Sequence, residues 1–336
     1  MLKLLTEAFG PSGYEDDVRD ILKAHMTKFC DDIIVDNIGN LICHKIGKKF
    51  NGKSIVLCAH MDEVGMIVSH ITKDGYLKIK PIGGMDAAVW VSKRVIIGPD
   101  RISGVVGVNP IHLNKDNDTE IKFADLYVDI GATSKTDAEK YVNIGDYGCL
   151  DSKYVEFGDG IIKAKALDDR IGCYIMTKIA EKSLDADVYY VFTVQEEIGC
   201  RGSKTAIKNL DVDFAVVIES TTCADYPNVD KYEFTTKLGN GPALSMRDGG
   251  TYADIGLTQE IADIGSKNGI PFQYKQNTTG GNDSSSLQLT GNGIKVTALS
   301  VPCRYMHSGA NVESLEDIAN LEKLLFTFIE SKVDCK

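Results

Sequence analysis

Short apolar runs alternate with helical segments along much of the chain. Runs at residues 54–60, 188–194 and 214–218 are almost continuously apolar, which is typical of strands buried on both faces of a parallel sheet. Further strands are predicted at residues 32–35, 41–46 and 297–301, and helices at residues 16–27, 170–182, 203–209, 254–267 and 314–331. The last helix starts with Ser314 and Asp317 at the spacing of a capping box. This alternation indicates an α/β fold with a mostly parallel central sheet flanked by helices.

The pattern changes between residues 66 and 160. Apolar and polar residues alternate there in short segments, at residues 75–80, 93–97, 103–108 and 124–130, with Gly, Pro and Asp between them. A period of two is typical of half-buried antiparallel strands. We therefore expect two domains: residues 1–65 and 161–336 form the α/β domain, and residues 66–160 form a small inserted β-barrel or β-sandwich.

Composition narrows the class of protein. Of the 336 residues 43% are hydrophobic and 25% are charged, which is ordinary for a globular protein with a large core. The net charge of −11 and the lack of a basic stripe exclude a nucleic-acid binder and disfavour anionic membranes. Nine cysteines, an odd number without a CxxC pair, argue against a disulfide framework and a zinc ribbon. With no signal-peptide pattern and no apolar run long enough to cross a bilayer, a cytoplasmic location is expected.

Histidines and acidic residues gather where predicted strands end or helices begin. The groups are His60 with Asp62, Asp168 with Asp169, Glu196 with Glu197, Glu219, and His307. Ligands of open α/β sheets bind beyond the carboxyl ends of the strands, so we expect these side chains to converge. Imidazole and carboxylate ligands suit zinc, and a carboxylate can bridge two ions. The other histidines, His25, His44, His70 and His112, are interpreted as structural.

A site with two metal ions explains why so many of these residues are present. One carboxylate must bridge the ions, each ion needs about two further ligands, and one carboxylate must stay unligated to accept a proton from water. The sequence supplies a full set in His60, Asp168, Glu196, Glu197, Glu219 and His307.

The ordered motifs resemble, nearly from end to end, the glutamyl aminopeptidase and tetrahedral aminopeptidase family of dinuclear metallopeptidases. The resemblance is carried by Ser12-Gly13-Tyr14-Glu15, His60-Met61-Asp62, Asp168-Asp169-Arg170, Glu196-Glu197, Gly280-Gly281-Asn282-Asp283 and His307-Ser308. It implies an enzyme that hydrolyses the N-terminal residue from peptides. It also implies two divalent ions per chain, zinc first, with cobalt or manganese as alternatives.

The resemblance implies a ligand role for five residues. It makes Asp168 the bridge between the ions. His60 and Glu219 complete the coordination of one ion, and Glu197 and His307 complete the coordination of the other. Glu219 departs from the family, which commonly has Asp there; because Glu reaches one methylene further, ligation is retained but metal preference can change.

The resemblance also implies roles beyond the ligands. Glu196 is the general base that activates the bridging water, and Asp62 orients the ring of His60. The peptide bond between Asp168 and Asp169 is expected to be cis.

Substrate and assembly are implied in the same way. Residues Gly280, Gly281, Asn282 and Asp283 are expected to line the substrate cleft, although Asn282 stands where a hydroxyl residue is common. The inserted domain is expected to build homo-oligomers, from dimers up to a tetrahedral shell of twelve chains. The preferred first residue of the peptide stays open among acidic, basic and apolar side chains.

Three other functions compete with this interpretation. Residues 47–54 match the phosphate-loop pattern GxxxxGK[ST], but an apolar strand follows them where that motif requires a helix. A glucanase-type hydrolase needs a pair of carboxylates without this histidine set. Loss of a metal ligand would favour a metal-binding assembly protein, but every expected position holds a competent residue. Each acidic motif also has a simpler explanation: Glu196 and Glu197 as a helix N-terminus, Asp62 as a turn residue and Asp169 as a helix cap.

Overall fold

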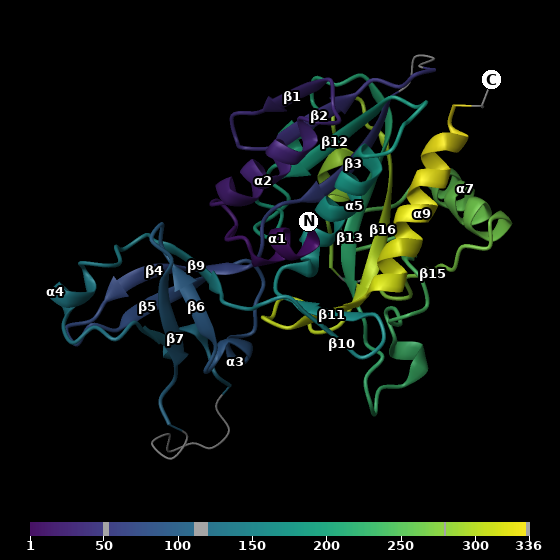
Figure 1. Ribbon diagram of the computed structural model, residues 1–336. Coiled ribbons are helices and arrows are strands. Elements are labelled where there is room, and N and C mark those ends of the chain that lie inside the picture. The colour runs from purple at the N-terminus through teal and green to yellow at the C-terminus, as the bar shows by residue number, and fades with distance from the viewer. Residues whose placement is uncertain (50–53, 111–119, 279, 334–336) are drawn as a thin grey trace.

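The computed structural model describes residues 1–49, 54–110, 120–278 and 280–333. An eight-stranded sheet forms the centre of the larger part of the molecule (Figure 1). In spatial order its strands are β1 (Asp32–Val35), β2 (Leu41–Lys45), β12 (Val188–Thr193), β3 (Ser54–His60), β13 (Val212–Thr222), β16 (Lys295–Cys303), β14 (Ala243–Ser245) and β15 (Gln273–Tyr274).

The four central strands of this sheet are parallel. β3 pairs with β12 on one side and with β13 on the other, and β13 pairs with β16, all in parallel. The antiparallel pairs lie toward the edges, between β1 and β2, β2 and β12, and β14 and β16. The predicted α/β class with a mostly parallel centre is confirmed, and the carboxyl ends of four adjacent strands meet at one edge.

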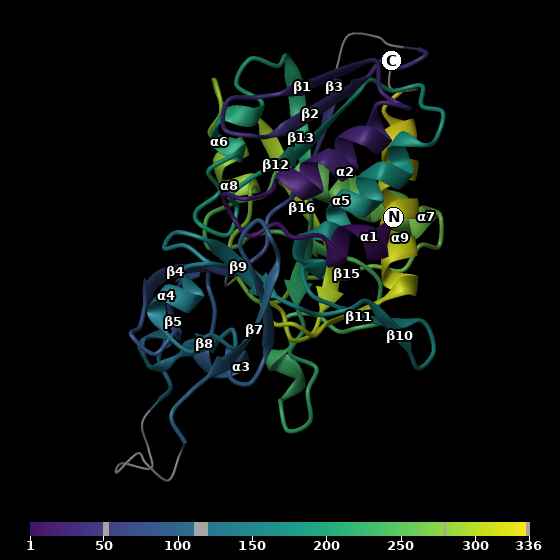
Figure 2. The ribbon, with the colours of Figure 1, turned by 60° about the vertical axis from the view of Figure 1, so that its left-hand side comes forward.

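Helices cover both faces of the sheet (Figure 2). One face carries α1 (Leu2–Glu7), α2 (Asp16–Met26), α5 (Leu167–Ala180), α7 (Ile255–Lys267) and α9 (Leu315–Ser331), and the other carries α6 (Ser203–Ala206) and α8 (Ser284–Leu287). Strand β3 shows why both faces need cover: Ile55 and Leu57 belong to the core under α5, whereas Val56 and Cys58 belong to the core under α6 and α8.

The segment between β3 and α5 contains a closed six-stranded barrel with a core of its own, packed around the fully buried Trp90. It lies beside the α/β part (Figure 1). In barrel order the strands are β4 (Gly65–Ile71), β5 (Leu77–Ile82), β8 (Tyr127–Asp129), β7 (Ile102–Gly107), β6 (Arg94–Ile97) and β9 (Tyr147–Leu150). The short helices α3 (Ala87–Trp90), η2 (Phe123–Asp125) and α4 (Lys135–Ala138) connect them. Of the two expected architectures, the structure has the barrel.

Several elements differ from the sequence-based expectations. β13 extends to Thr222, so Glu219 lies inside the strand and not after it, because pairing with the long β16 continues past the apolar run. A second sheet of β10 (Val155–Phe157), β11 (Ile161–Ala164) and β17 (Asn311–Ser314), and the helices α1 and η3 (Lys231–Glu233), were not predicted.

The start of α9 differs in part from the expectation, whereas a strand follows the loop motif as expected. Ser314 caps α9 as predicted, but the Asp317 carboxylate accepts hydrogen bonds from the backbone N–H groups of Gly239 and Gly241, so no reciprocal capping box forms. Residues 50–53 of the phosphate-loop match lie outside the described residues, and a strand, β3, begins directly at Ser54. Among the described residues, no helix combines the length and apolar character needed to cross a bilayer.

Candidate active site

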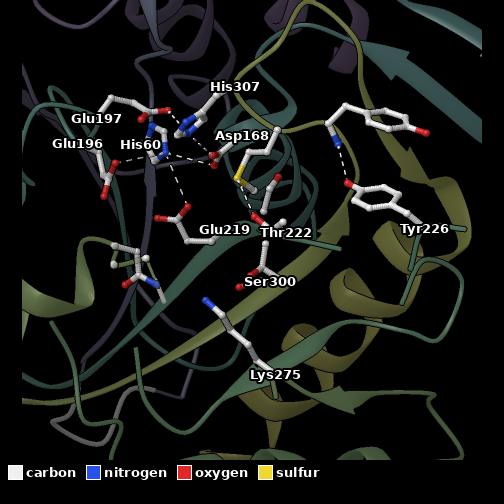
Figure 3. A pocket seen from close by; sticks show the side chains of 17 residues that line it. His60, Asp168, Glu196, Glu197, Glu219, Thr222, Tyr226, Lys275, Ser300 and His307 are labelled. Carbon is white, nitrogen blue, oxygen red and sulfur yellow. Dashed lines mark hydrogen bonds and ion pairs between the residues drawn. The ribbon is translucent and has the colours of Figure 1, made fainter. Parts of the chain in front are cut away.

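The carboxyl edge of the central strands carries a cavity of about 510 Å³ (Figure 3). His60 ends β3, Glu219 lies near the end of β13, and Asp168 lies at the start of α5. The loops after β12 and β16 supply the remaining members. The structure thus brings together all six candidates at the cavity wall, namely His60, Asp168, Glu196, Glu197, Glu219 and His307.

Asp168 stands between two sets of side chains. Its Oδ1 lies 3.5 Å from His60 Nε2, and its Oδ2 lies 3.4 Å from His307 Nε2. His60 Nε2 lies 3.7 Å from Glu219 Oε2, and His307 Nε2 lies 3.2 Å from Glu197 Oε1. Each oxygen of one carboxylate therefore faces a different histidine and glutamate. The bond from Asp168 to Asp169 is cis, as the resemblance implied.

Buried oxygens in this cluster lack hydrogen-bond partners. Asp168 Oδ1, Glu197 Oε1 and Glu219 Oε1 are buried, and no donor among the described residues hydrogen-bonds to them. Burial raises the pKa of Glu219 well above its usual value, and the neighbouring Asp169 raises it further. Because buried polar atoms normally find a partner, these oxygens fit a site that receives cations. The donor set of imidazole nitrogens and carboxylate oxygens suits a divalent metal.

The spacing of possible ligand atoms also fits a metal site. Atoms of His60, Asp168 and Glu197 lie within 4.8 Å of one another, and so do atoms of His60, Asp169 and Glu219. Asp169, however, also accepts hydrogen bonds from the backbone N–H groups of Gly172 (2.9 Å) and His60 (3.2 Å). Asp168 and Asp169 have non-helical backbone angles, so the Asp169 carboxylate caps the regular part of α5 that follows them and also holds the end of β3.

Glu196 lies at the wall of the cavity but is not one of the residues that surround Asp168. Its Oε2 is 4.0 Å from His60 Nε2, and its Oε1 accepts a hydrogen bond from the Cys200 thiol at 3.2 Å. Burial is the main cause that raises the pKa of Glu196 to about 8, and Asp283 and Glu197 add to it. Glu196 and Glu197 do not start a helix, because α6 begins only at Ser203. A carboxylate with a raised pKa beside a cation site is suited to accept and return a proton.

Asp62 supports the cavity from behind. Its carboxylate accepts hydrogen bonds from the backbone N–H groups of Glu196 (2.9 Å) and Glu197 (3.1 Å), and from the Ser12 hydroxyl (2.6 Å). His60 Nδ1 lies 3.1 Å from the Asp62 backbone carbonyl and 3.5 Å from its carboxylate. Asp62 therefore holds the loop that carries both glutamates as well as the ring of His60.

The turn near the N-terminus completes this support. Glu15 Oε1 accepts hydrogen bonds from the backbone N–H groups of Gly13 (2.7 Å) and Gln195 (3.2 Å). Burial, followed by the nearby Asp62, raises the pKa of Glu15 to about 7. Reasoning from single motifs missed Ser12 and Glu15 as supports of the site. Ser12 contacts Asp62, 50 residues further along the chain, and Glu15 contacts Gln195, 180 residues further along. Only the family resemblance pointed to this turn.

Of residues 280–283, which were expected to line a substrate cleft, three lie at the cavity wall and one is buried behind it. Gly280, Gly281 and Asn282 line the cavity. Asp283 is fully buried behind them, where its carboxylate accepts hydrogen bonds from the Thr193 hydroxyl and the Cys58 thiol.

The wall also contains residues that the sequence did not single out. Lys275, just after β15, points its amine toward the centre of the cavity (Figure 3). Burial lowers the pKa of Lys275, and the nearby Asp248, Glu219 and Asp168 oppose that shift. Tyr226 and Tyr305 stack with ring centroids 5.6 Å apart at another part of the wall. Lys275 follows a two-residue strand that has no periodicity to read.

The other three described histidines lie away from the cavity. His25 pairs with Glu181, His44 contacts Asp187 at 2.7 Å, and His70 lies in barrel strand β4. His112 lies outside the described residues.

Comparisons with known proteins point to one family. Residues 39–324 match the family described as M42 glutamyl aminopeptidase. The lysyl aminopeptidase of Pyrococcus furiosus is 33% identical, over 98% of this chain and 96% of that protein. An aminopeptidase structure from the archaeon Desulfurococcus kamchatkensis superposes with a TM-score of 0.94, at 36% identity, over 98% of this chain and 93% of that one. The TET1 peptidase of Pyrococcus horikoshii, which can assemble into a tetrahedron or a large octahedral shell, has a TM-score of 0.87 at 31% identity, with 98% of each chain covered.

Proposed function

The chain belongs to the M42 glutamyl aminopeptidase family, and from this premise we propose that it removes the N-terminal residue from peptides with the help of two divalent metal ions. The observation that carries the proposal is the position of Asp168, whose two carboxylate oxygens face different histidines at 3.5 and 3.4 Å. One carboxylate shared in this way is what a bridge between two ions requires.

The same geometry suggests which residues hold the ions. His60 and Glu219 with Asp168 would hold one, and Glu197 and His307 with Asp168 would hold the other. When bound, the ions supply a Lewis acid for the scissile carbonyl and lower the pKa of water, toward roughly 7 in favourable zinc sites. The mixed nitrogen and oxygen donors favour zinc, and cobalt or manganese are compatible with the same set.

Proton transfer in the proposed reaction is assigned to Glu196. It takes a proton from the attacking water and gives that proton to the amine that leaves when the peptide bond breaks. Asp62 and Glu15 hold the backbone on either side of Glu196, so the carboxylate is kept at one place beside the cavity. A fixed position of the base contributes more to the rate than a higher pKa does, because proton transfer requires the base to lie within hydrogen-bond reach of the proton.

Action at the N-terminus follows from the charge of the cavity. Four carboxylates line its wall, and three more, those of Asp62, Asp169 and Asp283, are buried next to them. Two divalent ions would not neutralise all seven. A free α-amino group carries positive charge and can pair with a remaining carboxylate, whereas an internal peptide bond offers no such group. The proposed enzyme therefore distinguishes the end of a peptide by charge as well as by shape.

A panel of aminoacyl-anilides tests this function. Metal-loaded protein should release aniline from substrates with a free amino group, should not act on their N-acetyl forms, and should lose activity on treatment with a chelator. A β-glucan substrate serves as the comparison, because a two-carboxylate glycosidase has no need of metal. Hydrolysis of β-glucan that survives chelation, with no anilide cleaved, would replace the peptidase proposal by the glucanase alternative.

The first residue of the substrate is proposed to be acidic. The Lys275 amine points into the cavity that also holds the metal-ligand candidates, and a half-buried cation at this place favours a carboxylate on the first side chain. This preference agrees with the description glutamyl in the family's name and differs from that of the lysyl relative.

Replacing Lys275 with Met removes the charge and keeps a similar length. We expect kcat/KM for a glutamyl-anilide to fall by about 10- to 100-fold, because a hydrogen bond to a charged group contributes about 1.5–3 kcal/mol. The value for a leucyl-anilide should change little. Lys267→Met, at the end of α7, is the matched control. An equal loss on both substrates would show that Lys275 does not select the side chain.

The chain is also proposed to work as a cytoplasmic homo-oligomer, dimer-based and up to a tetrahedral dodecamer. In this proposal residues 66–160 form the oligomerisation domain, and residues 1–65 and 161–336 form the catalytic domain. Support comes from the P. horikoshii peptidase, which covers 98% of this chain and forms a tetrahedron or an octahedral shell. Light scattering on the purified protein would give the size of the assembly.

A further inference from the structure

The barrel makes a direct contact with one of the candidate metal ligands. His307, in the loop after β16, places its Nδ1 2.6 Å from the backbone carbonyl oxygen of Gly84. Gly84 lies in the connection between β5 and α3 of the barrel. A residue of the α/β domain is therefore held by the backbone of the inserted domain. The two residues in contact are 223 positions apart in the sequence.

This contact fixes the state of the imidazole ring. A carbonyl oxygen can only accept a hydrogen bond, so Nδ1 must be the nitrogen that carries the proton. Nε2, which lies 3.4 Å from Asp168 and 3.2 Å from Glu197, is then the nitrogen that would bind the metal ion. A hydrogen bond on the far nitrogen orients a metal-binding histidine and raises its basicity.

The preceding residue packs against the second ligand of the same ion. Gly83 has a φ of +87°, and a Cβ added there would lie 2.9 Å from Val64 Cγ1 and 3.3 Å from Glu197 Cβ. Only glycine adopts this backbone conformation without strain and leaves room for both neighbours. The two adjacent glycines thus contact both His307 and Glu197.

We propose that the Gly83–Gly84 turn of the barrel positions Glu197 and His307, and so sets the affinity for one of the two metal ions but not for the other. This inference rests on the proposed metal-dependent function. The other histidine, His60, is held from within the α/β domain, by the Asp62 carbonyl at 3.1 Å. The side chain of His60 is 1% exposed, whereas that of His307 is 32% exposed. His307 therefore depends more on a single contact for its orientation.

Zinc titration of metal-free protein, by equilibrium dialysis with metal analysis, tests the inference. In Gly83→Val the weaker-bound second ion should bind about 10- to 100-fold less tightly than in wild type, the range seen when partners of metal ligands are changed. The first ion should bind as in wild type.

A second barrel variant serves as the control. Gly131→Val has a similar positive φ of +78°, but no atom lies within 4 Å of its added Cβ, so it has the backbone strain without displacing a neighbour. It should bind two ions as wild type does. Equal zinc affinities in Gly83→Val and Gly131→Val would overturn the inference, whereas wild type that binds no zinc would overturn the proposed function instead.

A measurement on wild type covers the case in which Gly83→Val does not fold. Long-range ¹H–¹⁵N spectra of zinc-loaded protein report which nitrogen of each of the six histidines carries a proton, and His307→Gln identifies the signal of His307. We expect a proton on Nδ1. A proton on Nε2 would mean that His307 cannot donate to Gly84, and the inference would fall.

Discussion

Replacing Glu196 with Gln should lower kcat for aminoacyl-anilide hydrolysis by about 10²- to 10⁴-fold, the usual contribution of a positioned general base. The amide has nearly the same size and can still accept a hydrogen bond from the Cys200 thiol, but it cannot take up a proton. Because Glu196 is not one of the proposed metal ligands, the variant should keep the wild-type metal content and a similar KM.

Metal analysis alongside the kinetics separates the possible roles of Glu196. Glu139→Gln, an exposed glutamate next to barrel helix α4, is the matched control and should retain full activity. A kcat within tenfold of wild type would mean that Glu196 is not the base. Loss of an ion together with activity would instead make Glu196 a ligand.

Replacing Asp168 with Asn should weaken the binding of both ions, by about 100-fold or more, since even partners of metal ligands contribute 10- to 100-fold. Each oxygen of Asp168 faces a different histidine, and an amide offers one oxygen and no charge. Titration with zinc should therefore show both binding steps shifted, and peptidase activity should fall below detection at metal concentrations that saturate wild type.

Glu219→Gln provides the contrast for Asp168→Asn. Of the two histidines at the cavity, Glu219 faces only His60, at 3.7 Å, so its substitution should weaken one ion and leave the other bound. A variant at Asp168 that keeps one ion at full affinity would show that the carboxylate does not bridge.

Glu219 stands where the family resemblance leads us to expect Asp. It lies inside β13 and pairs with Ser300 of β16. Its side chain places Oε2 3.7 Å from His60 Nε2, so the longer residue still reaches the other candidate ligand.

Apolar patterning predicted the central strands because their burial is complete. Strand β3 was expected at residues 54–60 and is found at Ser54–His60, with every residue buried. The end of β13 was missed because Glu219 and Ser220 are polar, although pairing with β16 keeps them extended. Strand β15, with two residues, is too short to show a period.

The candidate site was predictable where polar side chains follow apolar strands or open a helix. His60 and His307 were predicted from strand ends and Asp168 from a helix start, and the structure brings them to one cavity. The Gly84 contact was not predictable, because a backbone carbonyl leaves no mark in the sequence. Lys275 was missed because nothing local distinguishes it from a surface lysine; only the packing of β14 and β15 beside β16 turns it inward.

The most direct measurement is an anomalous difference map from crystals of the zinc-loaded protein, recorded at the zinc edge. We expect two peaks that flank the Asp168 carboxylate, one beside His60 and Glu219 and the other beside His307 and Glu197. A single peak, or a pair of peaks that does not share Asp168, would contradict the two-ion site on which the proposed peptidase function depends.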